Sequence, residues 1–327
     1  MAVHKQKGDA HMKLVYMGTP DFAVPALVSL VEAGHEVAAV VTQPDKPKGR
    51  GKAVQMTPVK EKALSYGIPV YQPIRVKKDE EFFNILKEIQ PDAIVVAAFG
   101  QILPKEILDL PRYGCVNIHA SLLPKYRGAA PIQWAVIDGE KESGITTMMM
   151  DVGLDTGDML DQLIIPLAED ETGGSLFDKL SEAGGPLILE TLKKLENGTA
   201  VRTPQPENGA TYAGMLDKSL GNIDWTRSAT ELERLIRGLN PWPSAYTHYG
   251  SKIMKLWAAG VLPENFEGKP GEIVKVLKDC FLVKTGEGTL AVKELQLEGK
   301  KRMDAGAFLR GFPLKEGEAG LLKCRKP

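Results

Sequence analysis

Short apolar runs alternate with helical patterns through the first part of the chain, and this alternation limits the possible folds more than any other feature. The runs are residues 13–18, 36–41, 68–71, 93–98 and 114–119, and the helical patterns lie near residues 20–33, 59–66 and 80–89. Runs rich in Val and Ala without polar alternation are typical of strands buried on both faces. We therefore predict an α/β fold with a mostly parallel sheet. Its ligand site should lie beyond the carboxyl ends of the strands.

The first domain is predicted to end with a strand over residues 144–151, a returning strand over 159–166 and a helix over 175–195. Pro204 and Pro206 then interrupt regular structure in a segment rich in Gly and polar residues. We predict a domain of residues 12–198 that is followed by a linker of residues 199–212.

The pattern changes beyond this linker. Ser228 and Glu231 have the spacing of a capping box ahead of apolar residues with helical period, which predicts a short helix. Short runs separated by Gly, Asp or Pro follow, at residues 246–249, 253–258, 271–277, 281–284 and 289–297. They predict a small antiparallel barrel within a second domain of residues 213–327.

The amino-terminal residues 1–11 are polar and lack the apolar region of a secretory signal. We interpret them as a leader outside the fold. No segment approaches the roughly 20 apolar residues that a membrane span needs, so we expect a cytoplasmic protein. The three cysteines are widely spaced and indicate neither a disulfide framework nor a metal site.

The net charge of −1 argues against a protein that coats nucleic acid along its whole surface. The charge is nevertheless uneven, because residues 211–327 contain 19 Lys and Arg against 14 Asp and Glu. The carboxyl-terminal third is therefore the basic part of the chain.

Asn117 and His119 are two residues apart at the end of a predicted strand, so their side chains should share one face. A histidine beside a carboxylate can hold or pass a proton during attack on a carbonyl, and Asp155 is the candidate carboxylate. The Asn117 amide can donate to an oxygen that becomes negative. These residues predict an acyl-transfer site, but the spacing equally allows two turn residues and a core histidine.

Motifs for covalent or cofactor chemistry are absent from the sequence. There is no Gly-x-Ser-x-Gly elbow, no Gly-x-Gly-x-x-Gly fingerprint, no phosphate loop and no His-Glu-x-x-His. Cys115 is a weak candidate nucleophile, because a small buried side chain is the more common use of such a cysteine. Direct transfer between two bound substrates is the simpler hypothesis.

Two basic segments are candidates for contact with a polyanion. Residues 42–52 carry cations among Pro and Gly, and a second cluster lies near the carboxyl terminus. Cations bind a nucleic acid by releasing its counterions, and an Arg can also interact with a base edge. A solvated surface is the alternative for both segments. The cations are Lys46, Lys48, Arg50 and Lys52, and then Lys300, Lys301 and Arg302.

Two phrases, residues 117–132 and residues 150–158, resemble the methionyl-tRNA formyltransferases. The shorter phrase Asn-x-His-x-Ser-Leu-Leu-Pro is typical of the wider group of 10-formyltetrahydrofolate-dependent enzymes. The basic segment at 42–52 and the separate second domain favour the tRNA enzymes. This resemblance implies a Rossmann-like catalytic domain, an OB-like barrel that binds tRNA, 10-formyltetrahydrofolate as donor and methionyl initiator tRNA as acceptor.

The resemblance also implies roles for individual residues. Asn117, His119 and Asp155 match the catalytic trio, and Arg50 matches the principal residue that contacts tRNA. The other basic residues named above are expected to assist it. We expect a monomer without a metal. The residues implied in folate binding are Ser121, Leu122, Leu123, Pro124, Phe99, Gly100, Gln101, Ile102 and Leu103.

The expected function is transfer of a formyl group to the methionyl amine by direct attack, for translation initiation. One alternative is a formyl transferase that acts on a nucleotide-linked amine. A second is an RNA-binding protein without catalysis. A nicotinamide oxidoreductase is disfavoured, because the glycine fingerprint is missing.

Overall fold

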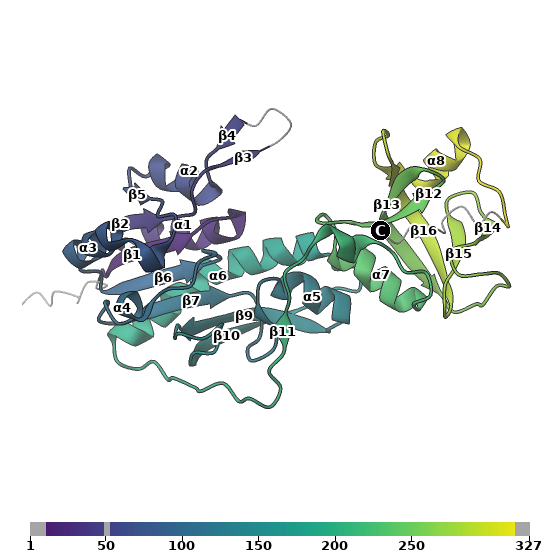
Figure 1. Cartoon of the computed structure of the whole chain (residues 1–327). Coiled ribbons are helices and arrows are strands. Elements are labelled where there is room, and N and C mark those ends of the chain that lie inside the picture. Colours follow the sequence, from purple (N-terminus) through teal and green to yellow (C-terminus); the bar gives the residue numbers. More distant parts are fainter. Residues whose placement is uncertain (1–10, 49–52, 318–327) are drawn as a thin grey trace, which may run out of the picture. The chain divides into compact units, whose positions relative to one another are not determined.

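The structure is a computed structural model that describes residues 11–48 and 53–317 (Figure 1). Its contacts divide the chain into two compact units. The first unit comprises residues 1–128, 143–165 and 177–212, and the second comprises residues 129–142, 166–176 and 213–327. Each unit has its own sheet and its own hydrophobic core.

Within the described residues, seven strands form the sheet of the first unit in the order β10-β9-β7-β6-β1-β2-β5. The strands are β1 Lys13–Gly18, β2 Glu36–Val41, β5 Val70–Tyr71, β6 Ala93–Ala97, β7 Cys115–His119, β9 Glu142–Met149 and β10 Met159–Pro166. Strands β5, β2, β1, β6 and β7 pair in parallel, and β9 pairs antiparallel to β7. The predicted mostly parallel sheet is therefore confirmed.

Helices cover both faces of this sheet. One face packs a core cluster in which Phe82 and Leu86 of the helix at Glu80–Ile89 contact strand residues. On the other face the long helix approaches closely, since a Cβ added at Gly184 would lie 3.1 Å from the Ile118 side chain. The helices of this unit are α1 Val24–Glu32, α2 Pro58–Ser65, α3 Glu80–Ile89, α4 Lys105–Leu108 and α6 Gly173–Glu196, with 3-10 turns at Asp21–Ala23 and Val76–Lys78.

The start of the first helix differs from the pattern in the sequence. Thr19 and Pro20 resemble an N-cap followed by Pro at the first helical position, but a 3-10 turn intervenes and α1 begins at Val24. The Thr19 hydroxyl instead donates to the Phe99 carbonyl oxygen, at 3.0 Å. Thr19 therefore does not cap α1, because its hydroxyl bonds a residue that is distant in the sequence.

The basic segment at residues 42–52, which we expected to be a loop, includes one short strand and leads into a second. Lys46–Lys48 (β3) and Ala53–Gln55 (β4) pair as a two-stranded antiparallel hairpin. Three-residue strands with a central Pro47 carry no alternating pattern, so the sequence offered no strand signal there.

In the described part of the second unit, six strands form an antiparallel sheet in the order β12-β13-β16-β15-β14, with β17 paired to β16. The strands are β12 Ala245–Tyr249, β13 Lys252–Leu262, β14 Ile273–Val276, β15 Phe281–Lys284, β16 Thr289–Leu297 and β17 Met303–Asp304. The predicted antiparallel domain is confirmed.

The short pair β8 Arg127–Gly128 and β11 Tyr212–Ala213 forms a separate ribbon.

The helices of the second unit are α5 Pro131–Asp138, α7 Ala229–Gly238 and α8 Ala305–Gly311, with a 3-10 turn at Lys218–Gly221. Gly238 allows α7 to pack closely on α5, because a Cβ there would lie 2.4 Å from Ile137. Helix α5 was not predicted. Its N-cap residue is Ala130, whose side chain cannot accept a hydrogen bond, so the usual start signal is missing.

The predicted capping box at the start of α7 is confirmed. The Ser228 hydroxyl accepts from the Glu231 N–H at 3.2 Å, and Glu231 accepts from the Ser228 N–H at 3.0 Å. The backbone bond from Ser228 is the main cause that lowers the pKa of Glu231 to about 2, and the Ser228 hydroxyl and Arg227 add to it. The ionised Glu231 therefore stabilises the helix.

Ser228→Ala should lower the stability of the second unit by about 0.5–2 kcal/mol, because a helix donor loses its acceptor. All four tryptophans lie in this unit, so their fluorescence in urea reports its unfolding. The stabilisation that Glu231 contributes is fully present above the ordinary pKa of a glutamate. It is lost as the pH falls toward about 2, where Glu231 becomes protonated in the folded protein. Ser251→Ala, on an exposed turn, is the control, and equal midpoints for both variants would contradict the prediction.

Candidate active site

Asn117 and His119 lie on β7, at the carboxyl end of the parallel strands. Ile118 between them packs toward Gly184 of α6, so the alternation of a strand directs the two flanking side chains to the opposite face. The shared face predicted from their spacing is therefore confirmed. Both residues are buried, with 9% of Asn117 and 6% of His119 exposed.

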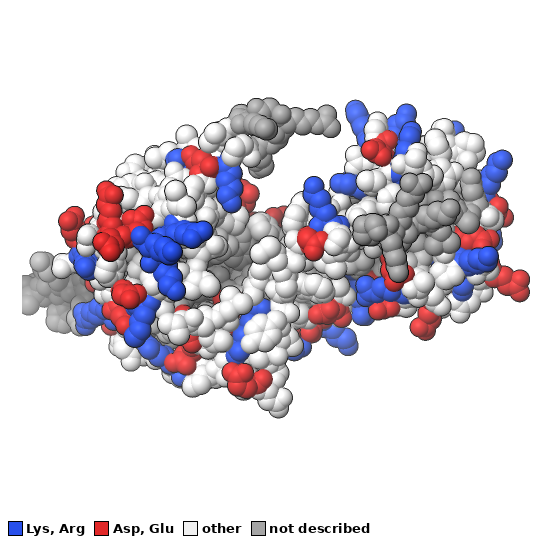
Figure 2. Space-filling model, viewed as in Figure 1, with Lys and Arg blue, Asp and Glu red and all other residues white. Residues whose placement is uncertain are grey.

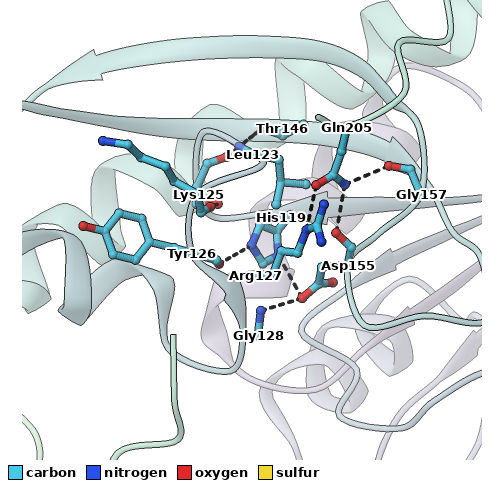
Figure 3. A network of polar contacts seen from close by, with 11 residues as sticks. His119, Leu123, Lys125, Tyr126, Arg127, Gly128, Thr146, Asp155, Gly157 and Gln205 are labelled. Atoms are coloured by element: carbon cyan, nitrogen blue, oxygen red, sulfur yellow. Dashed lines mark hydrogen bonds and ion pairs between the residues drawn. The ribbon is translucent and has the colours of Figure 1, made fainter. Parts of the chain in front are cut away.

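The imidazole of His119 is held between two partners (Figure 3). Its Nε2 lies 2.9 Å from the Tyr126 carbonyl oxygen. A carbonyl oxygen only accepts, so Nε2 must carry a hydrogen. The other nitrogen, Nδ1, faces Asp155 with 3.7 Å to Oδ2. The ring is therefore oriented with one nitrogen toward the Tyr126 carbonyl oxygen and the other toward the Asp155 carboxylate.

Asp155 lies in the loop between β9 and β10, and its side chain is 14% exposed. The same Oδ2 atom that faces His119 accepts from the Gly128 N–H at 2.8 Å. Asp155 has a φ of 54°, in the left-handed region that residues other than Gly adopt only occasionally. Local contacts hold this backbone conformation, and it points the carboxylate toward His119 and the Gly128 N–H.

The carboxamide of Asn117 has a different environment. Within the part of the chain that the structure describes, it has no hydrogen-bond partner, although Asn117 is almost completely buried. Its amide atoms are not among the fully buried polar atoms without a partner, so a ligand that enters the site can reach them. Asn117 therefore presents a donor beside a histidine and carboxylate pair, which is an arrangement suited to a developing oxyanion.

Residues 121–124 form a tight turn after β7. The Ser121 hydroxyl donates to a carbonyl oxygen within the turn at 2.7 Å, and the Leu123 N–H donates to the Thr146 hydroxyl at 3.1 Å. Ser121 and Leu123 are buried, whereas the other two side chains of the stretch are half-buried. Leu122 and Pro124 are therefore the more accessible side chains of this stretch.

Residues 99–103 follow the end of β6. Phe99 and Leu103 belong to the hydrophobic core, each 2% exposed. Gln101 hydrogen-bonds the backbone of a neighbouring loop. Gly100 has a φ of 84°, and Ile102 is 72% exposed. The side chain of Ile102 and the backbone near Gly100 are thus the accessible parts of this stretch.

A pocket of about 530 Å³ opens beside the loop that carries Asp155. Its lining includes Thr156 and Gly157 from that loop, together with the cations Lys105, Arg112 and Arg202. Among the residues that the structure describes, no group of three His, Cys, Asp or Glu is placed to hold a metal. No described helix is both long and apolar enough to cross a membrane.

The basic hairpin contains Lys46, which is exposed on β3. Lys48 belongs to the same strand, and its side chain is not described. Arg50 and Lys52 lie outside the described residues. The structure therefore shows the base of the segment predicted to contact tRNA.

An ionic network fixes this base. Lys60 Nζ lies 2.5 Å from Asp45 Oδ2, and Gln72 Nε2 donates to Asp45 Oδ1 at 2.8 Å. The hydrogen bond from Lys60, followed by that from Gln72, holds the pKa of Asp45 below its ordinary value. Gln43 Nε2 donates to the Phe99 carbonyl oxygen at 3.2 Å. The hairpin base is thereby joined to residues 99–103.

The second predicted basic cluster follows β16. Lys300 and Lys301 are exposed, but Arg302 makes a bidentate ion pair with Glu294, at 2.6 and 2.7 Å. This pairing raises the pKa of Arg302. Its guanidinium also lies over the Trp257 ring, 4.7 Å from the centroid. In Figure 2 basic and acidic side chains are interspersed on the visible face of the second unit.

Sequence profiles of known families match most of the chain. The formyl transferase profile matches residues 12–192, and the profile of the formyl transferase carboxyl-terminal domain matches residues 215–313. The chain belongs to the formyl transferase family.

Several relatives of this formyl transferase align over nearly the whole chain. A protein named methionyl-tRNA formyltransferase from Agathobacter rectalis is 58% identical over 306 residues, which covers 94% of this chain and 98% of that protein. One with the same name from Acetivibrio thermocellus is 53% identical over 308 residues, with 94% and 99% covered.

Solved structures share the fold at lower identity. An N-formyltransferase from Helicobacter canadensis, solved with folinic acid and dTDP-3-aminofucose, has a TM-score of 0.65 and 20% identity. The match covers 86% of this chain and 98% of that one. HypX from Aquifex aeolicus, solved with tetrahydrofolic acid, has a TM-score of 0.61 and 19% identity. That match covers 92% of this chain but only 47% of HypX.

Arg127 and Gln205 contact the candidate site and were not named as site residues from the sequence. Arg127 is buried with 1% exposed, and its Nε donates to Gln205 Oε1 at 2.9 Å. Gln205 Nε2 reaches the loop of Asp155. Arg127 follows closely on the phrase that contains His119, but nothing in the predicted linker marked Gln205 as a partner.

Cys115 is not placed to act as a nucleophile. Its side chain is 1% exposed, and Sγ lies 3.7 Å from the Ile107 carbonyl oxygen. Burial, with a smaller contribution from the Asp109 charge, raises the pKa of the thiol to about 12. Since the thiolate is the reactive form, this cysteine is inert at neutral pH.

Iodoacetamide at pH 8 should therefore alkylate Cys115 at least about 100-fold more slowly in the folded protein than in urea. Peptide mapping by mass spectrometry measures both rates. Cys280, which is half-buried, serves as an internal comparison in the same digest. Faster labelling of Cys115 in the folded protein than in urea would contradict the prediction.

Proposed function

We propose that this formyl transferase moves the formyl group of 10-formyltetrahydrofolate to the α-amine of methionyl initiator tRNA. The observation that carries the proposal is the 58% identity, over 94% of the chain, to a protein named methionyl-tRNA formyltransferase. The arrangement of Asn117, His119 and Asp155 supports it, because these groups fit transfer at a carbonyl carbon.

The proposed step is a direct transfer. The neutral amine forms a bond from its nitrogen to the formyl carbon, and the bond from that carbon to N10 of the donor breaks. The amine nitrogen loses one proton and N10 gains one, so the products are the formyl amide and tetrahydrofolate. The carbonyl oxygen becomes negative while both nitrogens are attached to carbon.

Each residue of the trio then has its own role. Asn117 donates its unpartnered amide N–H to the negative oxygen. The His119 ring adds positive charge beside it when both of its nitrogens carry a proton. Asp155 orients that ring and directs the proton toward N10 through water.

The donor is proposed to lie between residues 99–103 and 121–124, beside the loop that carries Asp155. The pocket of about 530 Å³ next to this loop is lined by Lys105, Arg112 and Arg202, and also by Asp109, Asp151 and Asp158. Lys105 pairs with Asp109, so Arg112 and Arg202 are the cations that would bind the carboxylates of the folate glutamate.

The acceptor tRNA is proposed to contact the basic hairpin through Lys46, Lys48, Arg50 and Lys52. We assign catalysis to residues 12–198 and further tRNA contacts to residues 213–327, joined by the segment 199–212. Lys300 and Lys301 are the stronger candidates in the second unit, because Glu294 already compensates Arg302. We propose a cytoplasmic monomer.

The proposal is tested by incubating the full chain with 10-formyltetrahydrofolate and charged tRNA. Formylmethionine should form on initiator tRNA at a rate at least about 100-fold above that on elongator methionyl-tRNA, and formation of tetrahydrofolate should match it in amount. A nucleotide-linked amino sugar is the competing acceptor. Transfer to the sugar alone, or tRNA binding without any transfer, would exclude the proposed function.

Asp155→Asn should reduce kcat by about 100-fold or more and change the donor dissociation constant by less than about threefold. The variant keeps the shape of the side chain and can still accept from Gly128, but the charge that orients His119 is lost. Rapid-quench and fluorescence titration measure the two quantities. Asp178→Asn, the same change on an exposed position of α6, is the control. Unchanged turnover in Asp155→Asn would remove Asp155 from the site.

A further inference from the structure

The segment that leads away from the first unit contributes a side chain to the loop of Asp155. Gln205 Nε2 donates to the Asp155 carbonyl oxygen and to the Gly157 carbonyl oxygen, at 2.8 Å each. Gln205 is half-buried, whereas residues 201–204 and 206–209 are exposed. This single inward side chain therefore bridges the backbone on both sides of residue 156 (Figure 3).

The orientation of the Gln205 amide is determined by Arg127. A guanidinium only donates, so the atom 2.9 Å from Arg127 Nε must be the amide oxygen. The amide nitrogen then faces the two carbonyl oxygens, as the distances require. Arg127 is buried, and an exposed carboxylate of Glu207 lies 3.8 Å from its Nη1. Burial of this cation holds the amide in one of its two orientations.

The contacted residue is one of five described residues other than Gly that have a positive φ, and Tyr126 next to Arg127 is another. Residues other than Gly adopt the left-handed region only occasionally, Asp more readily than most, and surrounding contacts help to hold them there. Asp155 has this conformation, with a φ of 54°. Asp151 holds the start of the loop by accepting from Gly153 and Thr156, and Gln205 holds its end.

The backbone around Arg127 completes the arrangement. Tyr126 on one side accepts from His119, and Gly128 on the other side donates to Asp155. The Arg127 N–H itself donates to the Thr211 carbonyl oxygen at 2.8 Å. Residues 205–211 therefore contact both the turn that holds the imidazole and the loop that holds the carboxylate.

We propose that Gln205, oriented by Arg127, is a positioning residue for formyl transfer that holds Asp155 in the left-handed conformation facing His119. This inference rests on the proposed function. Gln205 touches neither substrate in the proposal, so it acts only through Asp155.

Substitutions at Gln205 separate its two functions, which are to accept from Arg127 and to donate to the loop of Asp155. Gln205→Glu keeps the size and the acceptor for Arg127, but it loses both donors and sets a carboxylate against two carbonyl oxygens. Gln205→Met keeps the length and loses every polar contact. Glu207→Gln changes charge in the same segment near Arg127 and leaves the Asp155 loop untouched, so it is the matched control.

The experiment measures kcat and the donor KM for these variants, with 10-formyltetrahydrofolate and methionyl initiator tRNA. Gln205→Glu and Gln205→Met should lower kcat by about 10- to 100-fold while the KM changes by less than about threefold, since misplacing a catalytic group mainly affects the transition state. Glu207→Gln should stay within about twofold. In the Asp155→Asn background, Gln205→Glu should add less than about threefold, because the group it positions is already removed.

Hydrogen exchange of residues 151–158 gives a readout that requires no activity. Exchange there should accelerate at least about tenfold in both Gln205 variants at unchanged thermal stability. A kcat within twofold of wild type, or an equal loss in the Asp155→Asn background, would overturn the inference. Failure of the proposed function is distinguishable, because the wild type itself would then form no formylmethionine.

Discussion

The hydrogen bond between His119 Nε2 and the Tyr126 carbonyl oxygen is the interaction on which the rest of the site depends. It joins the end of β7 to the turn that follows, and it determines which ring nitrogen faces Asp155. A ring turned by 180° would place carbon atoms at both positions and lose both contacts. Because the acceptor is a backbone atom, the orientation of the imidazole is built into the course of the chain.

The fold was predictable where local signals and tertiary packing agree. The strand at Met159–Pro166 and the helix at Glu80–Ile89 have the bounds that the apolar patterns indicate. The prediction failed where the structure depends on distant partners. The Thr19 hydroxyl bonds Phe99 rather than capping a helix, and helix α5 begins without a capping side chain. The contact of Thr19 joins residues that no short window of sequence contains, whereas α5 lacks the capping side chain that would have marked its start.

The candidate site was predictable to a similar extent. The period of a strand was sufficient to direct Asn117 and His119 to one face. Asp155 was named as the candidate carboxylate from the sequence, but no spacing rule placed it beside His119. The contact between Arg127 and Gln205 joins residues 78 positions apart in the sequence. A glutamine between two prolines has no periodicity or charge pattern that would mark it, so only the three-dimensional arrangement shows its partners.

The Phe99 carbonyl oxygen links the two segments that are proposed to bind the two substrates. The Phe99 carbonyl oxygen accepts from both Thr19 and Gln43, and Gln43 also accepts, through its own backbone, a hydrogen bond from Gln72 in the network at the hairpin base. The segment assigned to the donor and the segment assigned to the acceptor thus share one anchor. If the two substrates bind as proposed, a variant at Thr19 or Gln43 would loosen the anchor of both segments.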